Sequence, residues 1–514
     1  MPPVDEGDNY TGQIDLVKKR GEVAAAASEA ASLPGDSSAA SGAEEADKTA
    51  SDEAGILQQE TKPMPAVVWP PPEPIHHVPV NPPSLRKRPA PSSTGGGGTI
   101  VTGPHGVLTT ELRRALPPWA LPLLTAQPFS VWIAARIGIT LLALLATMMI
   151  PAIAAQGTAN WYDAPGGPVL NPLVNSIGGV WTRWDGQWYL KIASEGYSSA
   201  DGSSAFFPLY PWLITVFGWL AGERFIWAGI LLSSFFFLGA LVLLHRLVRL
   251  DFHHEDAGRT VFYLAAFPMA FFFWAVYSES LFLFLSVAAL LAMRTQRWWW
   301  AAVLISLAIW TRTTGLLLLL PLGWELWRAH NPPVPTDPRA MPPKRPSRWA
   351  LPSLALPFAS LLLFVVWSWV VFHDPLAALS AQADWNRHFS WPWQTIAGAW
   401  NVATQTGLQF QPENQSWTYL GSFVFAVIVG ALALRWLRAS YSIYLWAGII
   451  FPLFSATPHN PLLSYPRFLA VLFPAFIVLA LMGRNRYANQ IITWVSLLLL
   501  ALYTIRFANW YWVA

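Results

Sequence analysis

Apolar segments long enough to cross a lipid bilayer recur from residue 129 onwards in this 514-residue sequence. A membrane-spanning helix needs about 20 mostly apolar residues. The chain is 54% hydrophobic and only 12% charged, whereas soluble domains carry about a quarter charged residues. The sequence therefore predicts an all-α polytopic membrane protein. About eleven spans are predicted, at 129–154, 225–248, 260–277, 279–293, 298–311, 314–328, 350–372, 417–434, 440–456, 467–483 and 490–512.

Residues 1–128 differ in composition from the rest of the chain. They are rich in Ala, Ser, Pro, Glu and Asp and lack the short basic and then apolar opening of a secretory signal. Such a composition buries too little apolar surface to form a core. We expect a disordered cytoplasmic extension over 1–128 and a multi-pass domain over 129–514.

The segment 205–221 is apolar, but it is short and contains two prolines. If it does not cross the membrane, the Arg-rich loops after residues 245, 293, 327, 434 and 483 all fall on the cytoplasmic side. That arrangement obeys the positive-inside rule, and the alternative violates it. We therefore predict a juxtamembrane helix at 205–221 inside a first outer loop of about 155–224.

The first outer loop contains a stretch in which charged and aromatic residues meet. If 181–195 is helical, Trp181, Trp184 and Trp188 share a face, as in an interfacial helix, and Asp185 borders that face. Tryptophan also gathers at membrane interfaces without any other role, so an aromatic belt with a solvated Asp185 stays an alternative.

Three further polar motifs are predicted on the same outer side. They are Tyr277–Ser280, Thr311–Gly315 and Ser464–Arg467. Each motif alone has a structural alternative, because Glu279 can cap a helix and Arg312 or Arg467 can satisfy carbonyls at helix ends. Ionisable groups at a membrane edge are nevertheless functional candidates, because their burial is costly.

Together these groups suit sugar transfer from a polyprenyl-phosphate sugar. A carboxylate can take the proton of an acceptor hydroxyl, and arginines bind a departing phosphate through their planar fork. One base suffices for a single displacement with inversion, because phosphate is a stable leaving group. Asp185 is the candidate base. The candidate substrate-binding residues are Arg183, Trp184, Trp188, Tyr189, Lys191, Glu195, Tyr210, Tyr277, Glu279, Arg312 and Arg467.

Other chemistries find less support. The sequence has no cysteine, which excludes disulfides and cysteine nucleophiles, and it has no Walker loop, G-x-S-x-G or HExxH motif. The net charge of +3 does not imply nucleic acid. The run His253–Asp256 is either a metal cluster or, as we favour, a solvated loop. No cofactor is predicted, and a divalent metal stays open.

Several separated motifs resemble the PIG-V family of GPI mannosyltransferases and its prokaryotic relatives. The motifs are Arg183-Trp184-Asp185 with Trp188-Tyr189 and Glu195-Gly196-Tyr197; Ala205–Pro211; Phe267-Pro268 with Tyr277–Phe282; Thr311-Arg312 with Thr314-Gly315; and Pro466–Leu469 before Leu472–Pro474. They cover about residues 129–514. The resemblance implies a GT-C-type bundle in which Asp185 is the catalytic residue.

The same resemblance implies a dolichyl- or polyprenyl-phosphate mannose donor used on the lumenal or extracellular face, and a glycolipid or glycan acceptor. The unusual extension suggests a bacterial relative in the cell membrane, with the endoplasmic reticulum membrane as the eukaryotic alternative. A lipid-linked sugar flippase or a transporter is the competing class. In a protein of that class, charged groups are expected along a path near the bilayer midplane. In this sequence they are expected at one face of the membrane.

Overall fold

The computed structural model describes residues 127–149, 177–199, 201–332, 348–406 and 415–513. They fall within the second of two compact units, Thr99–Ala514. The predicted disorder of 1–128 lies almost wholly outside the described residues, as do the end of the predicted span 129–154 and residues 155–176 of the predicted outer loop.

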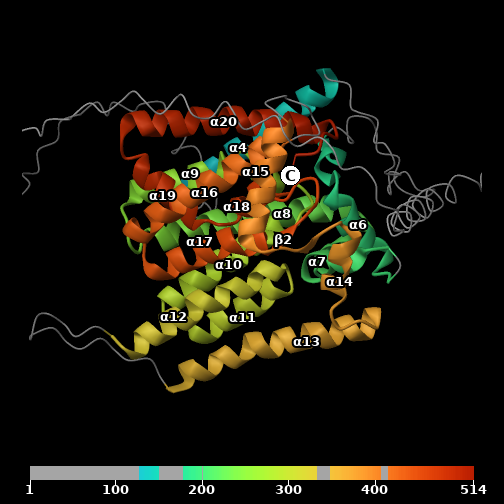
Figure 1. Cartoon of the computed structure of the whole chain (residues 1–514), viewed down its shortest axis with the longest axis horizontal. Helices are drawn as coiled ribbons and strands as arrows, with labels where there is room; N and C mark the ends of the chain where they lie inside the picture. The colour runs from blue at the N-terminus through green and yellow to red at the C-terminus, as the bar shows by residue number, and fades with distance from the viewer. Residues whose placement is uncertain (1–126, 150–176, 200, 333–347, 407–414, 514) are drawn as a thin grey trace, which may run out of the picture. The chain divides into compact units, whose positions relative to one another are not determined.

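The described chain is built almost entirely from helices (Figure 1). The α-helices are α4 Gln127–Met149, α6 Asp185–Glu195, α7 Leu209–Leu220, α8 Phe225–Val248, α9 His254–Ala265, α10 Glu279–Arg294, α11 Trp298–Ile309, α12 Leu319–His330, α13 Ala355–Phe372, α14 Ala377–Asp384, α15 Pro392–Thr406, α16 Ser416–Trp436, α17 Ala439–Ile450, α18 Tyr465–Ala470, α19 Pro474–Met482 and α20 Arg486–Ala508. The 3-10 helices are η1 Gly179–Thr182, η2 Ser203–Ala205, η3 Ala270–Phe273, η4 Thr313–Leu318, η5 Arg348–Leu354 and η6 Phe451–Phe454. Two short strands, β1 His388–Phe389 and β2 Ser455–Ala456, pair antiparallel.

Five described helices are long and apolar enough to cross a membrane, which confirms the predicted class of helical membrane protein. They are Gln127–Met149, Phe225–Val248, Ala350–Phe372, Ser416–Trp436 and Arg486–Ala508. The count of eleven spans stays a prediction, because several predicted spans are interrupted. The span 467–483 is divided into α18 and α19. Pro474 opens α19, because proline lacks the N–H that a continuing helix would use.

Helix α7 has 12 residues, which corresponds to about 18 Å at 1.5 Å per residue. This length agrees with the prediction that 205–221 does not cross. Helices α11 and α12 also have 12 residues, however, and both belong to predicted spans. Length alone therefore does not decide the topology, which stays a prediction.

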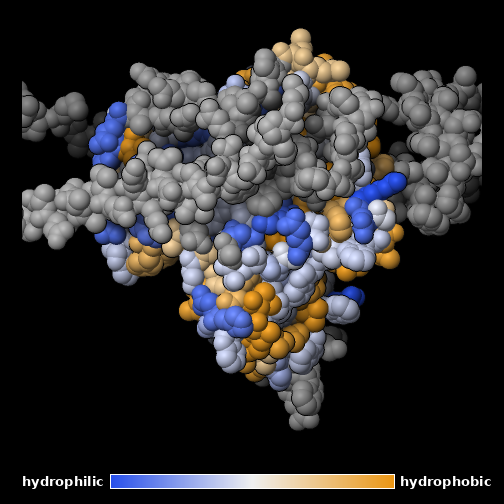
Figure 2. Space-filling model, turned by 90° about the vertical axis from the view of Figure 1, so that its right-hand side faces the viewer, coloured by the Kyte–Doolittle hydropathy of each residue, from blue (hydrophilic) through white to orange (hydrophobic). Residues whose placement is uncertain are grey.

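Helices α13 and α20 expose apolar side chains. Leu362 on α13 is 64% exposed and Trp494 on α20 is 70% exposed. Helix α13 packs against α11, and α20 packs against α4 (Figure 1). On the face drawn in Figure 2, hydrophobic patches alternate with hydrophilic ones. Apolar surface of this extent is expected where helices face lipid.

Residues 181–195 do not form one helix, so the condition under which Trp181, Trp184 and Trp188 would share a face is not met. Helix η1 ends at Thr182 and α6 begins at Asp185, with Trp184 between them at φ 56° and ψ −123°. A side chain with a Cβ rarely adopts a positive φ, so local propensity gave no sign of this break. Trp181 is consequently buried in the core and does not share an interfacial face with Trp188.

The expectation of a solvated loop at His253–Asp256 is wrong in part: His253, His254 and Glu255 are exposed, but the run is not a loop. His253 is the N-cap of α9, and Asp256 is only 1% exposed. Asp256 accepts hydrogen bonds from Arg259 at 2.6 Å and from Arg484 at 2.8 Å. The run therefore starts a helix that is tied to the loop after α19.

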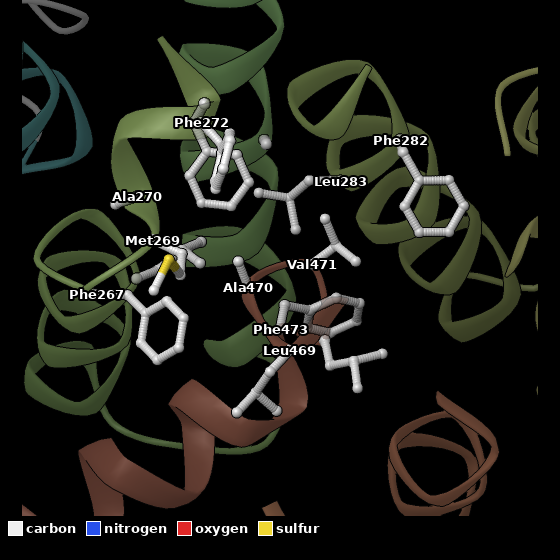
Figure 3. Packing of buried hydrophobic residues seen from close by; sticks show 14 of the residues in the cluster. Phe267, Met269, Ala270, Phe272, Phe282, Leu283, Leu469, Ala470, Val471 and Phe473 are labelled. Atoms are coloured by element: carbon white, nitrogen blue, oxygen red, sulfur yellow. The ribbon is translucent and has the colours of Figure 1, made fainter. Parts of the chain in front are cut away.

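A hydrophobic core lies beneath the segments that carry the outer polar motifs. Figure 3 shows Leu283 of α10 beside Phe272 of η3 and above Val471 of the α18–α19 junction, with Met269 and Leu469 in the same buried cluster. All five side chains are buried. This packing fixes α18 against the start of α10, and these two elements carry Arg467 and Glu279.

Candidate active site

Four charged residues from four segments meet at one place. Asp185 is the first residue of α6 and Glu279 is the first residue of α10. Arg312 is the N-cap residue of η4, and Arg467 lies in α18. We call these four residues the cavity cluster. The sequence predicted that they converge, and the structure brings all four together.

A continuous series of ion pairs links the cavity cluster. Arg467 donates from one terminal nitrogen to Asp185 Oδ2 at 2.5 Å and from Nε to Glu279 Oε1 at 2.5 Å. Arg312 donates to the same Oε1 of Glu279 at 2.6 Å. Glu279 therefore holds both arginines, and Arg467 holds Asp185.

Burial differs along this series. The side chain of Glu279 is fully buried, whereas that of Asp185 is 20% exposed. Asp185 Oδ2 accepts the bond from Arg467, and no donor among the described residues bonds Oδ1. Asp185 thus keeps one carboxylate oxygen available to a bound molecule.

Aromatic and hydroxyl groups fix the surroundings of the cluster. The Arg467 guanidinium lies 4.7 Å from the ring centroid of Tyr277, whose hydroxyl donates to the Arg183 carbonyl at 2.8 Å. The hydroxyls of Tyr189 and Ser278 are 2.8 Å apart. Burial raises the pKa of Tyr189 to about 12, so this phenol stays protonated at neutral pH.

Close backbone packing positions Arg312. A Cβ at Gly315 would lie 2.5 Å from the backbone of Ala308, which is closer than real side chains approach. Only glycine therefore lets η4 fold back onto the end of α11. This contact explains the glycine in the Thr311–Gly315 motif.

A cavity of about 520 Å³ opens beside the cluster. Its charged lining residues are Asp185, Arg312, Arg387 and Arg467. Most of the remaining wall is apolar and includes Ile309 of α11, Phe364 of α13 and Leu379 of α14. A cavity that is polar at one place and apolar elsewhere suits a ligand with a charged head and a hydrocarbon chain.

Arg387 was not selected as a substrate-binding residue, because its polar segment, with Trp385, Asn386 and His388, could either line an acceptor groove or be a solvated loop. It lies in the polar segment between α14 and β1, where the sequence shows only an arginine beside Trp385 and His388. The signal available from the sequence was its place in the long segment of about 373–416 between two predicted spans, which is expected on the outer side. The structure places Arg387 and Phe468 in the cavity wall.

Some predicted binding residues lie outside the cavity cluster. Lys191 bonds Asp201 at 2.7 Å, and Glu195 is exposed at the end of α6. The Tyr210 hydroxyl bonds Ser233 at 2.6 Å. These contacts do not involve the cavity cluster.

Three aromatic or basic residues of the 181–195 stretch form a second layer. The Arg183 guanidinium lies 4.3 Å from the ring centroid of Trp510, and burial lowers its pKa to about 10. Trp184 makes edge contacts with Trp510 and with Trp512, which lines the cavity. Trp188 stacks on Phe206, another lining residue.

No group of three or more His, Asp or Glu side chains in the described part of the chain is placed to hold a metal ion. The carboxylates of Asp185 and Glu279 instead share Arg467.

Residues 129–325 match the family model described as Mannosyltransferase (PIG-V). The PIG-V resemblance is confirmed for this segment. It contains Asp185, Glu279 and Arg312, whereas Arg387 and Arg467 lie beyond it.

Curated relatives match the same family. GPI alpha-1,6-mannosyltransferase 2 of Rattus norvegicus is 32% identical over 195 residues, covering 36% of this chain and 39% of the relative. The Homo sapiens protein of the same name is 29% identical over 196 residues, with the same coverage of both chains. The chain therefore spans about two fifths of the length of these relatives.

Solved structures of the Archaeoglobus fulgidus oligosaccharyltransferase also align with the chain. One apo structure gives 13% identity and a TM-score of 0.37, covering 74% of this chain and 55% of that chain. A TM-score this low leaves the GT-C-type arrangement a prediction.

Proposed function

We propose that this protein is a GT-C-type mannosyltransferase. It transfers a mannosyl residue from a polyprenyl- or dolichyl-phosphate sugar to a hydroxyl of a glycolipid or glycan acceptor. One observation carries the proposal: Asp185 lines the cavity with one oxygen held by Arg467 and the other without a partner among the described residues. The family match over 129–325 supports the same chemistry.

In the proposed reaction, Asp185 acts as the general base. Its Oδ1 takes the proton of the acceptor hydroxyl while the acceptor oxygen attacks the anomeric carbon of the sugar. The bond from that carbon to the phosphate oxygen breaks, and its electron pair stays on the phosphate. A single displacement of this kind inverts the anomeric configuration.

The arginines bind the phosphate, and Glu279 positions them. Arg312 and Arg467 present planar donors that suit phosphate oxygens, and their shared partner Glu279 fixes both side chains before substrate arrives. The apolar wall receives the start of the isoprenoid chain. Binding groups fixed in advance stabilise developing charge without reorganisation.

We place the reaction at the outer or lumenal membrane face, on the basis of the distribution of Arg and Lys between the predicted spans. A bacterial cell membrane is the proposed location. A flippase is less favoured, because the cavity cluster is confined to one end of α10 and the ends of α6, η4 and α18.

The test offers purified protein a panel of polyprenyl-phosphate sugars and compares the parent with Asp185→Asn. The variant should still bind donor, but its transfer should fall by at least about a hundredfold, the usual scale for losing a general base. Glu223→Gln is the control. This substitution also removes one carboxylate, but Glu223 is exposed in the turn before α8. Transfer by Asp185→Asn at near the parental rate would exclude the base role.

A further inference from the structure

The three arginines of the cavity are not equivalent. Arg312 and Arg467 each contact a carboxylate of the cavity cluster. Among the side chains that the structure describes, no carboxylate lies within ion-pair distance of Arg387. The only hydrogen bond of its guanidinium there is a long one of 3.4 Å to the Leu463 carbonyl.

Arg387 is nevertheless held in a defined place. The Asn386 N–H bonds the Ala383 carbonyl and the Arg387 N–H bonds the Gln382 carbonyl, which is the Schellman pattern of a helix C-terminus. Asn386 takes the positive φ of 54° that this turn requires. Directly after Arg387, strand β1 pairs with β2, so the residue is fixed on both sides.

The surroundings of Arg387 favour an anion. Its guanidinium carbon lies 5.9 Å from the ring centroid of Phe468, and Arg312 lies at the same distance from that ring. Burial, and then the neighbouring Arg467, lower the pKa of Arg387. A partly buried cation beside another cation gains free energy when an anion binds.

The summed charge of the site indicates the charge of the anion that it binds. The five groups are two carboxylates, Asp185 and Glu279, and three arginines, so their sum is +1 when all are ionised. A polyprenyl-phosphate sugar is a phosphodiester of charge −1. The donor therefore neutralises the empty site.

We propose that Arg387 is the primary binding group for the donor phosphate, and that Arg467 becomes available to the phosphate only when Asp185 takes up the acceptor's proton. This inference rests on the proposed transferase function and reassigns the first phosphate contact within it. Protonation of Asp185 removes one negative charge and raises the sum of the five groups to +2. The leaving polyprenyl monophosphate carries up to −2, so the site's charge follows that of the ligand.

The step balances as written. The acceptor O–H bond breaks, and its proton goes to Asp185 Oδ1. The bond between the acceptor oxygen and the anomeric carbon forms as the bond from that carbon to phosphate breaks, and the electron pair remains on phosphate. The terminal nitrogen of Arg467, no longer paired with a charged Asp185, then donates to the phosphate, while its Nε stays bonded to Glu279.

The experiment measures the binding of polyprenyl monophosphate and of inorganic phosphate to the intact protein in detergent. Arg387→Gln should weaken polyprenyl monophosphate binding by at least about tenfold, since it removes a charge-assisted contact. Arg387→Lys keeps the charge but loses the fork, so it should weaken binding by a smaller factor. Arg224→Gln is the matched control, because Arg224 is exposed before α8 and outside the cavity, and it should bind as the parent does.

Asp185→Asn supplies the opposite prediction. The substitution fixes the summed charge of the five groups at +2. The variant should therefore bind polyprenyl monophosphate at least about tenfold more tightly than the parent, while transfer is lost. Parental binding by Arg387→Gln, or no tightening in Asp185→Asn, overturns the inference even if transfer still depends on Asp185. Parental transfer by Asp185→Asn instead overturns the proposed function. Equal affinity for inorganic phosphate would show that the site does not select a lipid phosphate.

Discussion

Helix α10 carries a charge cluster at each end, and the two clusters differ in what surrounds them. Glu279 at its start belongs to the cavity cluster. Arg294 at its end belongs to a second group, Asp251, Arg294, Glu325 and Arg438, which we call the closed cluster. The 16 residues of α10 correspond to about 24 Å.

In the closed cluster, each carboxylate has an arginine and a hydroxyl. Asp251 is bonded by Arg294 and by Tyr441 at 3.2 Å, and Glu325 by Arg438 at 3.0 Å and by Ser440 at 2.6 Å. Two negative charges meet two positive charges, and none of the four residues lines the cavity.

The comparison shows that buried ion pairs do not by themselves indicate a catalytic site. Both clusters pair carboxylates with arginines. The cavity cluster differs in three respects: it borders a cavity, Asp185 keeps an oxygen without a partner, and Arg387 adds an uncompensated charge. We therefore assign chemistry to the cavity cluster and folding stability to the closed cluster.

The largest effect is expected for Glu279→Gln, which removes the charge that both Arg312 and Arg467 share. Breaking a buried pair costs about 3–5 kcal/mol of unfolding free energy. Transfer per folded molecule should fall by at least about a hundredfold, because the phosphate-binding groups lose their positions. Thermal unfolding in detergent and the transfer rate measure the two effects. An unchanged rate would place Glu279 in a purely structural role.

Smaller losses of stability and of turnover are expected for Gly315→Ala. The added Cβ would meet the backbone of Ala308 at 2.5 Å, so η4 must move and carry Arg312 with it. Overpacking of this kind costs about 1–3 kcal/mol, and we expect about a tenfold loss of kcat/KM from the displaced arginine. Gly323→Ala in α12 is the control, because a Cβ there meets nothing within 4 Å. Equal behaviour of the two variants would contradict this account.

Arg438→Gln should separate the two clusters. It removes a charged hydrogen-bonding partner of Glu325 and should cost about 2 kcal/mol of stability. Transfer per folded molecule should stay within about twofold of the parent, because the closed cluster is remote from the cavity. The measurement is the transfer rate corrected for the folded fraction. A loss as large as that of Glu279→Gln would show that the closed cluster also supports turnover.

The smallest effect concerns acid stability. Hydrogen bonds from Arg484, and also from Arg259, lower the pKa of Asp256 to about 2. The contribution of ionised Asp256 to the free energy of unfolding is therefore present above the ordinary aspartate pKa of about 4, and it is lost as the pH falls towards 2. The melting temperature should fall less between pH 4 and pH 2 in Asp256→Asn than in the parent. Identical profiles of melting temperature against pH in the two proteins would contradict a stabilising role for the ion pairs of Asp256.

The sequence predicted the membrane class and the meeting of Asp185, Glu279, Arg312 and Arg467, because charged residues beside apolar segments are costly and therefore informative. It did not predict that Glu279 bonds both arginines, since Glu279 and Arg467 are 188 residues apart. It also missed the break at Trp184, whose positive φ runs against local preference. Arg387 lies in a polar segment, and neither the turn after α14 nor the pairing of β1 with β2 that flanks it could be predicted from the sequence.

The most direct test compares one carboxylate from each cluster after donor is bound. Parent, Asp185→Asn and Glu325→Gln are loaded with polyprenyl-phosphate mannose, acceptor is added, and single-turnover transfer is measured per donor-loaded molecule. The account predicts that Asp185→Asn transfers at least about a hundredfold more slowly than the parent and that Glu325→Gln stays within about twofold. Equal rates for the two variants would contradict the assignment of chemistry to the cavity cluster.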